Sequence, residues 1–147
     1  DWTRHTGDKI IGGIPKAYSE PNVDGGGPNP LYNFNSPTLA LPPPRGVGKG
    51  VTFRHPDPPE DLPTSADVSA ALAISDFSMF SVKLETDIHN SVHGWCHGSM
   101  GSVPTAAFDP IFWAHHCNID RIWAIWETTH ADNLPPDLTD LILSPFP

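Results

Sequence analysis

The chain has few basic residues, two cysteines and no long apolar run, and each shortage excludes a class of protein. Only eight of its 147 residues are Lys or Arg, against 17 Asp and Glu, so the net charge is −9. Such an acidic chain offers no counter-charge to a phosphate backbone, and no nucleic acid is expected as a partner. No apolar run approaches the roughly eighteen residues of a membrane-spanning helix, so no membrane contact is expected. Two cysteines outside a CxxC pair cannot form a disulfide framework and leave the compartment unassigned.

Proline and glycine are abundant in the first part of the chain. Residues 1–63 hold twelve of the 18 prolines and nine of the 12 glycines, including the runs at 25–30 and 42–44. Because these residues interrupt helices, we expect a Pro/Gly-rich loop segment over 1–63, with short strands near residues 51–53. A helical core is expected over 64–130 and a C-terminal tail over 131–147. The length suits a single domain or a fragment.

Beyond residue 63, apolar residues recur at helical spacing. A short helix is predicted over 66–74, and Ser75 is the expected N-cap of a second helix over 76–95, either continuous or broken near 85–87. Residues 94–107 are expected to form a loop. Asp109 followed by Pro110 is a strong helix start. The helix that follows, over 111–129, is rich in large apolar residues, and we expect much of its surface to be buried.

The eight histidines are as numerous as Lys and Arg together, and imidazole is the commonest metal ligand. His89 and His93 are four residues apart, so they lie on one face of a helix and can share a metal ion. His115 and His116 point about 100° apart, and periodicity does not decide which of them faces the same ion. The pattern predicts a three-His metal site between two helices, and imidazole suits Cu, Zn, Fe and Ni. His97, flanked by glycines, is expected in a loop.

Two stretches carry a specific motif. Residues 87–101 read HNxxH followed by a loop with Gly and Met, and residues 107–126 contain DPxFxxHHxxxDRxWxxW. Together they resemble the copper B half of the tyrosinase, catechol oxidase and mollusc haemocyanin family. The resemblance implies a mainly α fold: a helix pair carrying a three-His copper site, half of a type-3 copper four-helix bundle, with long Pro/Gly-rich loops. It also implies that the copper ligands are His89, His93 and His116, with His115 a structural neighbour.

The resemblance also implies a counterpart to this half. Residues 1–3 read DWT, similar to the end of a YWDWT segment that follows the copper A module in the family. Four histidines remain besides those of the HNxxH and HH pairs: His5, His55, His97 and His130. They do not make a second three-His cluster, so we expect one copper ion here and a second on a copper A-bearing chain or fragment. Neither Cys96 nor Cys117 can be assigned to the His–Cys thioether known in some members, which belongs to the other half.

The function implied by the resemblance is the oxidation of phenols or catechols to o-quinones with O₂. An oxygen-binding haemocyanin-like module, an inactive mononuclear copper fragment and a hydrolytic three-His site remain as alternatives. Glu85 lies four residues before His89, and Asn90 follows it. In similar tyrosinases these positions are thought to hold a water, which implies a bias toward monophenols. Such a water can accept the phenol proton, whose pKa is near 10. A role as solvated helix residues remains open for both.

Overall fold

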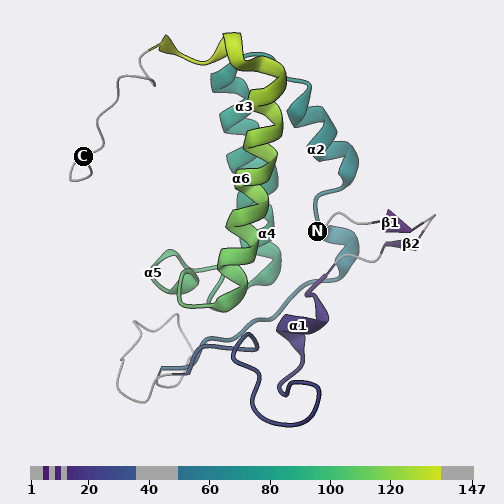
Figure 1. Cartoon of the computed structure of the whole chain (residues 1–147), viewed down its shortest axis with the longest axis vertical. Coiled ribbons are helices and arrows are strands. Elements are labelled where there is room, and N and C mark those ends of the chain that lie inside the picture. Colours follow the sequence, from purple (N-terminus) through teal and green to yellow (C-terminus); the bar gives the residue numbers. More distant parts are fainter. Residues whose placement is uncertain (1–4, 7–8, 11–12, 36–49, 137–147) are drawn as a thin grey trace.

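The computed structural model describes residues 5–6, 9–10, 13–35 and 50–136, and these form a mainly α-helical structure (Figure 1). The motif at 1–3, the proline run at 42–44 and the tail beyond residue 136 lie outside the described residues. No helix in the described part is both long and apolar enough to cross a membrane. The described elements are β1 (His5–Thr6), β2 (Lys9–Ile10), α1 (Lys16–Ser19), η1 (Pro59–Asp61), α2 (Ser65–Leu72), α3 (Phe77–Lys83), η2 (Leu84–His89), α4 (Asn90–Cys96), α5 (Val103–Ala106), α6 (Pro110–His130) and η3 (Ala131–Asn133).

The described part of the first 63 residues is largely irregular. β1 and β2 pair antiparallel over two residues each, and α1 is four residues long. The strand expected near 51–53 is reduced to an isolated bridge between Val51 and Asn35. The pairing stops there because the backbone of Phe53 is bonded to Ser99 instead, far along the chain.

The starts of α2 and α3 are set by side chains that accept backbone hydrogen bonds. Thr64 and Asp67 form a reciprocal capping box at α2. At α3 the N-cap is Asp76, whose carboxylate accepts from the Met79 N–H at 2.8 Å. The prediction of Ser75 as the cap was wrong by one residue, because the first bond of the helix, from the Phe80 N–H, goes to the Asp76 carbonyl at 2.9 Å.

The helix over 77–96 is neither a plain α-helix nor broken, because it passes through a π-helical turn, η2. At the end of η2 the Asn90 N–H donates to the Glu85 carbonyl, five residues back. Four buried side chains recur every fourth residue: Phe80, Leu84, Ile88 and Val92. In a pure α-helix each four-residue step drifts by about 40°. The wider π turn takes up this drift and keeps the four side chains on the core side.

The connection between α4 and α6 is more helical than expected. α4 extends to Cys96 and α5 occupies Val103–Ala106, so the loop predicted over 94–107 is confined to the residues around these elements. α6 begins as predicted, with Asp109 as N-cap accepting from the Ile111 N–H at 3.2 Å.

α6 is less buried than its composition suggests. Only His115, Ile122 and Trp126 are buried among its 21 residues, and Trp113 is 61% exposed. The prediction that much of its surface is covered was wrong. α6 lies against the α3–α4 run on one side and travels in the opposite direction (Figure 1), and within the described residues its outer face is left open.

Two apolar clusters hold the helices together. The first joins α2, the α3–η2 run and α6, and at its centre Phe80 stacks on Trp126 with ring centroids 4.5 Å apart. The indole N–H of Trp126 donates to the Ile74 carbonyl at 2.6 Å. The second cluster joins α4 to the loop beyond it and contains Val92, Trp95 and Met100. Both clusters orient the helices so that His89 and His93, on η2 and α4, face His115 and His116 on α6.

Candidate metal centre

Three imidazoles from two antiparallel helical runs converge on one point. His89 closes η2, His93 lies in α4 and His116 lies in α6. Their Nε2 atoms are separated by 3.1 Å (His93 to His89), 3.3 Å (His93 to His116) and 3.4 Å (His89 to His116). Imidazole nitrogens bind a metal at about 2.0–2.1 Å, so a tetrahedral ion separates two of them by about 3.3 Å. The spacing therefore fits a metal ion with three imidazole ligands.

The other ring nitrogen of His93 decides where its proton resides. Nδ1 lies 2.7 Å from the Met100 carbonyl oxygen. A carbonyl only accepts, so Nδ1 carries the proton and Nε2 presents its lone pair to the centre. Nδ1 of His89 lies 3.1 Å from a carboxylate oxygen of Glu85, although the pair is not aligned as a hydrogen bond. Both contacts favour the tautomer that binds a metal through Nε2.

His115 belongs to the same cluster but has a different orientation. One of its nitrogens lies within 4.8 Å of ligand atoms of His89 and His93, so distance alone makes it a further candidate ligand. Its ring is 4% exposed and lies parallel to that of His89, at an angle of 9° and a centroid separation of 5.3 Å. Because imidazole lone pairs lie in the ring plane, two parallel rings cannot aim them at one ion between them. The ring of His116 meets those of His89 and His93 at 78° and 62°.

Burial favours the neutral form of His93, His115 and His116. Desolvation lowers the pKa of both His93 and His116 below its usual value, and the neighbouring imidazoles lower it further. The effect is largest for His115, where burial lowers the pKa to about 3. Neutral imidazole is the form that binds a metal, so no proton has to leave these rings at neutral pH before an ion enters.

The metal-free chain should lose stability as the pH falls from 6.5 to 4.5. In the unfolded chain His115 titrates near 6.5, whereas in the folded chain its pKa is about 3, so the folded state binds fewer protons across this window. Two pH units then lower the free energy of unfolding by about 2 kcal/mol through this residue alone. Urea unfolding at several pH values measures the slope. His115→Leu should make the slope shallower, and an unchanged slope in that variant would contradict the assignment.

Glu85 and Asn90 lie beside the centre, on the π turn and directly after it. The Glu85 side chain is 61% exposed and Asn90 is also exposed, so water reaches both. On the other side the Phe112 ring packs on His116, with ring centroids 3.9 Å apart. The centre is therefore accessible to water along η2 and is covered by an aromatic side chain on the α6 side.

Cys96, whose role was left open by the sequence, is an unreactive core residue. It is 2% exposed, and desolvation raises the pKa of its thiol to about 12. A thiol in this state offers no thiolate as a metal ligand at neutral pH. Cys117 is exposed on α6, next to His116 in sequence, and is also a free cysteine.

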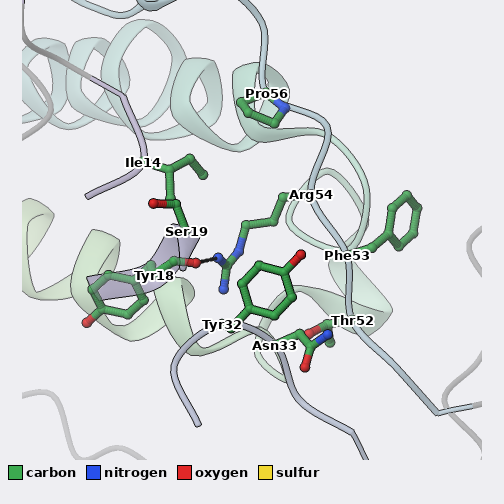
Figure 2. Close-up of a pocket in the computed structure, with 9 residues that line it drawn as sticks. All are labelled: Ile14, Tyr18, Ser19, Tyr32, Asn33, Thr52, Phe53, Arg54 and Pro56. Atoms are coloured by element: carbon green, nitrogen blue, oxygen red, sulfur yellow. Dashed lines mark hydrogen bonds between the residues drawn. The ribbon is translucent and has the colours of Figure 1, made fainter. Parts of the chain in front are cut away.

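Arg54 and Asp109 form a buried ion pair that sequence reasoning missed. The guanidinium donates to the carboxylate through two nitrogens, at 2.6 and 2.9 Å, and both side chains are almost fully buried. Arg54 also donates to the carbonyls of Tyr18 and Leu31. Figure 2 shows the Arg54 side chain extending into a pocket of about 300 Å³, with its bond to Tyr18. One side chain thus ties the N-terminal loop to the start of α6. No periodic pattern in the sequence marks this pair.

The fold and the site define a helix-pair protein with a three-imidazole metal centre. A family model described as the common central domain of tyrosinase matches residues 12–129. The chain therefore belongs to the tyrosinase family. Copper is the cofactor of this family, of which the hemocyanins are also relatives, and the three-imidazole group fits one copper ion.

Individual relatives include both tyrosinases and hemocyanins by name. Tyrosinase of Streptomyces antibioticus is 34% identical over 116 residues, which is 66% of this chain and 39% of that protein. Hemocyanin G-type of Enteroctopus dofleini is 53% identical over 57 residues, 36% of this chain and 2% of that protein. Oxygen-bound pro-tyrosinase of Aspergillus oryzae matches the fold with a TM-score of 0.68 at 24% identity, over 99% of this chain and 42% of that one. The chain thus spans less than half of each.

Proposed function

We propose that this chain is the copper B half of a tyrosinase-like polyphenol oxidase and that His89, His93 and His116 hold its copper ion. The convergence of three Nε2 atoms within 3.4 Å supports this most directly. Copper held by imidazoles supplies the redox chemistry by which O₂ oxidises two catechols to two o-quinones and two waters. The chain's own residues supply the ligands, their tautomers and a partly exposed edge where a substrate can approach.

Ring orientation supports the choice of His116 over His115. The three proposed ligand rings are steeply inclined to one another, which lets their in-plane lone pairs meet. His115 stacks flat against His89 and is buried beside it. We therefore assign His115 to holding the π turn against α6, next to the copper ion and outside its ligand shell.

We further propose that the second copper ion comes from a copper A-bearing chain or fragment. Among the described residues, one group of His, Cys, Asp or Glu has metal-binding geometry by distance, His89 with His93 and His115, and it shares two residues with the proposed ligand set. Type-3 chemistry needs two copper ions to take up the two-electron oxidation of one catechol. The 147-residue chain loaded with copper should therefore show no measurable oxidation of 4-methylcatechol above free copper, followed as O₂ uptake. Fast O₂ uptake by a verified monomer would contradict this.

A chimera separates this proposal from its alternative. The present chain would replace the matching residues of the Streptomyces antibioticus tyrosinase, to which it is 34% identical. If the chain is the copper B half of an oxidase, the chimera should oxidise 4-methylcatechol, and His116→Ala within it should abolish this activity. Reversible O₂ binding without quinone formation would instead favour the oxygen-carrier alternative, which the 53% identity to an octopus hemocyanin keeps in view. If the chimera binds copper but shows neither quinone formation nor reversible O₂ binding, the chain is an inactive mononuclear copper fragment.

Glu85 and Asn90 are proposed to hold a water that accepts the proton of a phenol. Their exposure beside His89 leaves room for such a water, and Glu85 supplies a carboxylate next to it. A phenol needs this help because its pKa is near 10, and general-base assistance contributes about 10²–10⁴-fold. In the chimera, Glu85→Gln and Asn90→Gly should each lower kcat/KM for a monophenol at least about tenfold more than for the matching catechol.

The control for this pair is Asp87→Asn, an exposed carboxylate on the same π turn whose partner is Lys83. This variant should leave kcat/KM unchanged for both the monophenol and the catechol. An equal fall for monophenol and catechol in the Glu85 and Asn90 variants would mean that these residues support the site in general and do not select the substrate.

A further inference from the structure

We propose that the extended segment 53–57 positions the His93 imidazole from outside the centre, by fixing the Met100 carbonyl that accepts its Nδ1 proton. Phe53 and Ser99 carry this effect as positioning residues, since neither touches the ligand nitrogens. The predicted effect on copper affinity rests on the proposed copper site, whereas the predicted effect on the His93 tautomer does not. The contact network itself is a property of the metal-free chain.

The segment 53–57 is bonded along its length to residues 95–99. The His55 and Asp57 N–H groups donate to the carbonyls of Cys96 and Trp95, each at 3.0 Å. The Ser99 N–H donates to the Phe53 carbonyl at 2.9 Å, and the Phe53 N–H donates back to the Ser99 hydroxyl at 3.1 Å. These bonds join residues more than 35 positions apart in sequence, so they are made by tertiary structure alone.

The close approach of the two segments depends on Gly98. Its φ is +55°, and a Cβ at this position would overlap the carbonyl oxygen of Phe53. His97, directly before it, also has a positive φ of 49°, a left-handed conformation that a non-glycine residue adopts at a cost. His97 Nε2 is held 2.8 Å from the Asp57 carboxylate, the far end of the same segment. The positive φ angles of His97 and Gly98 therefore turn the chain sharply after α4, so that the residues that follow lie against the segment 53–57.

Ser99 transmits this constraint to the metal centre. It is 2% exposed, and its N–H, hydroxyl and carbonyl are all bonded, the carbonyl by the Thr105 hydroxyl at 3.0 Å. Met100 follows directly, with its side chain buried and its carbonyl 2.7 Å from His93 Nδ1. The Met100 carbonyl has little freedom to rotate, because the N–H of the same peptide, that of Gly101, donates to the His97 carbonyl at 3.1 Å and the Ser99 carbonyl before it is also bonded. His93 is therefore kept with its proton on Nδ1 and its lone pair on Nε2.

Loosening this network should be visible as a change of tautomer. In water a neutral histidine favours the proton on Nε2, so without the Met100 carbonyl His93 would shift toward the form that cannot bind the ion through Nε2. Loss of such an indirect hydrogen bond typically lowers metal affinity about 10–100-fold. A role confined to stability would lower the melting temperature without changing the tautomer.

The test uses ¹⁵N NMR of the histidine side chains in the metal-free 147-residue chain, followed by Cu(II) titration. The variants are Gly98→Ala, which forces the two segments apart, and Ser99→Ala, which removes one hydroxyl and is expected to fold in either case. Gly94→Ala is the matched control, because a Cβ at Gly94 in α4 meets nothing within 4 Å. We expect the wild type and Gly94→Ala to hold His93 with its proton on Nδ1. Gly98→Ala and Ser99→Ala should populate the Nε2–H form and bind Cu(II) about 10–100-fold more weakly.

The two proposals fail in different ways. Wild-type ¹⁵N shifts for His93 in Ser99→Ala, or equal changes in Gly94→Ala, would overturn the positioning role whatever the copper affinity. A wild-type chain that does not bind Cu(II), while Ser99→Ala still changes the His93 tautomer, would overturn the proposed copper site and support the positioning network. A changed tautomer together with unchanged copper affinity would overturn the link from the network to metal binding.

Discussion

Replacing His116 by alanine is expected to weaken Cu(II) binding to the chain by at least about 100-fold. Structural zinc sites with four ligands have apparent binding free energies of about 10–16 kcal/mol, which is about 3 kcal/mol for each ligand if the four share it equally. That is about two orders of magnitude in the dissociation constant. The Nε2 atom of His116 lies 3.3–3.4 Å from those of both partners, so its loss removes a whole side of the site. Calorimetric titration with Cu(II) measures the change.

His115→Ala is the matched control, since it removes the neighbouring imidazole of the same helix. The parallel stacking of His115 on His89 predicts a loss of copper affinity of less than about tenfold, caused by a looser π turn. Equal losses in the two variants, or a large loss only in His115→Ala, would contradict the ligand assignment and favour the alternative group of His89, His93 and His115.

Asp109→Ala is expected to lower the free energy of unfolding by about 3–5 kcal/mol. The variant leaves the Arg54 guanidinium buried without its carboxylate, and uncompensated buried charges cost about this much. It also removes the N-cap of α6, worth about 1 kcal/mol. Urea unfolding followed by tryptophan fluorescence measures the difference.

Asp76→Ala separates the two contributions. Asp76 also caps a helix through its carboxylate, at the start of α3, but it is exposed. Its replacement should cost about 1 kcal/mol, the value of a cap without a buried ion pair. If Asp109→Ala costs no more than Asp76→Ala, the Arg54 pair does not stabilise the start of α6.

The helix pair and its histidines could be predicted because local signals specify them. The Asp109–Pro110 start of α6 follows from capping chemistry and the fixed φ of proline. The spacing of His89 and His93 places both on one face under any helical geometry. The family motif favours His116 as the third ligand, a choice that spacing alone leaves open. These features depend on residues within a few positions of each other, so the sequence contains the information to find them.

The features that could not be predicted arise from contacts distant in sequence. The bonds of Phe53 to Ser99 span 46 positions, and the Arg54–Asp109 pair spans 55. Neither produces a periodic pattern. The π turn was missed for another reason: four-residue spacing of Phe80, Leu84 and Ile88 is compatible with an α-helix over one step and departs from it only over several. The exposure of Trp113 was missed because composition does not say which faces find partners.

The number of imidazoles on bound copper tests the central claim most directly. The chain loaded with one equivalent of Cu(II) can be studied by electron spin echo envelope modulation, which detects the remote nitrogen of each coordinated imidazole. We predict three imidazoles in the wild type, two in His116→Ala and three in His115→Ala. Three in His116→Ala together with two in His115→Ala, or fewer than three in the wild type, would contradict a copper centre built from His89, His93 and His116.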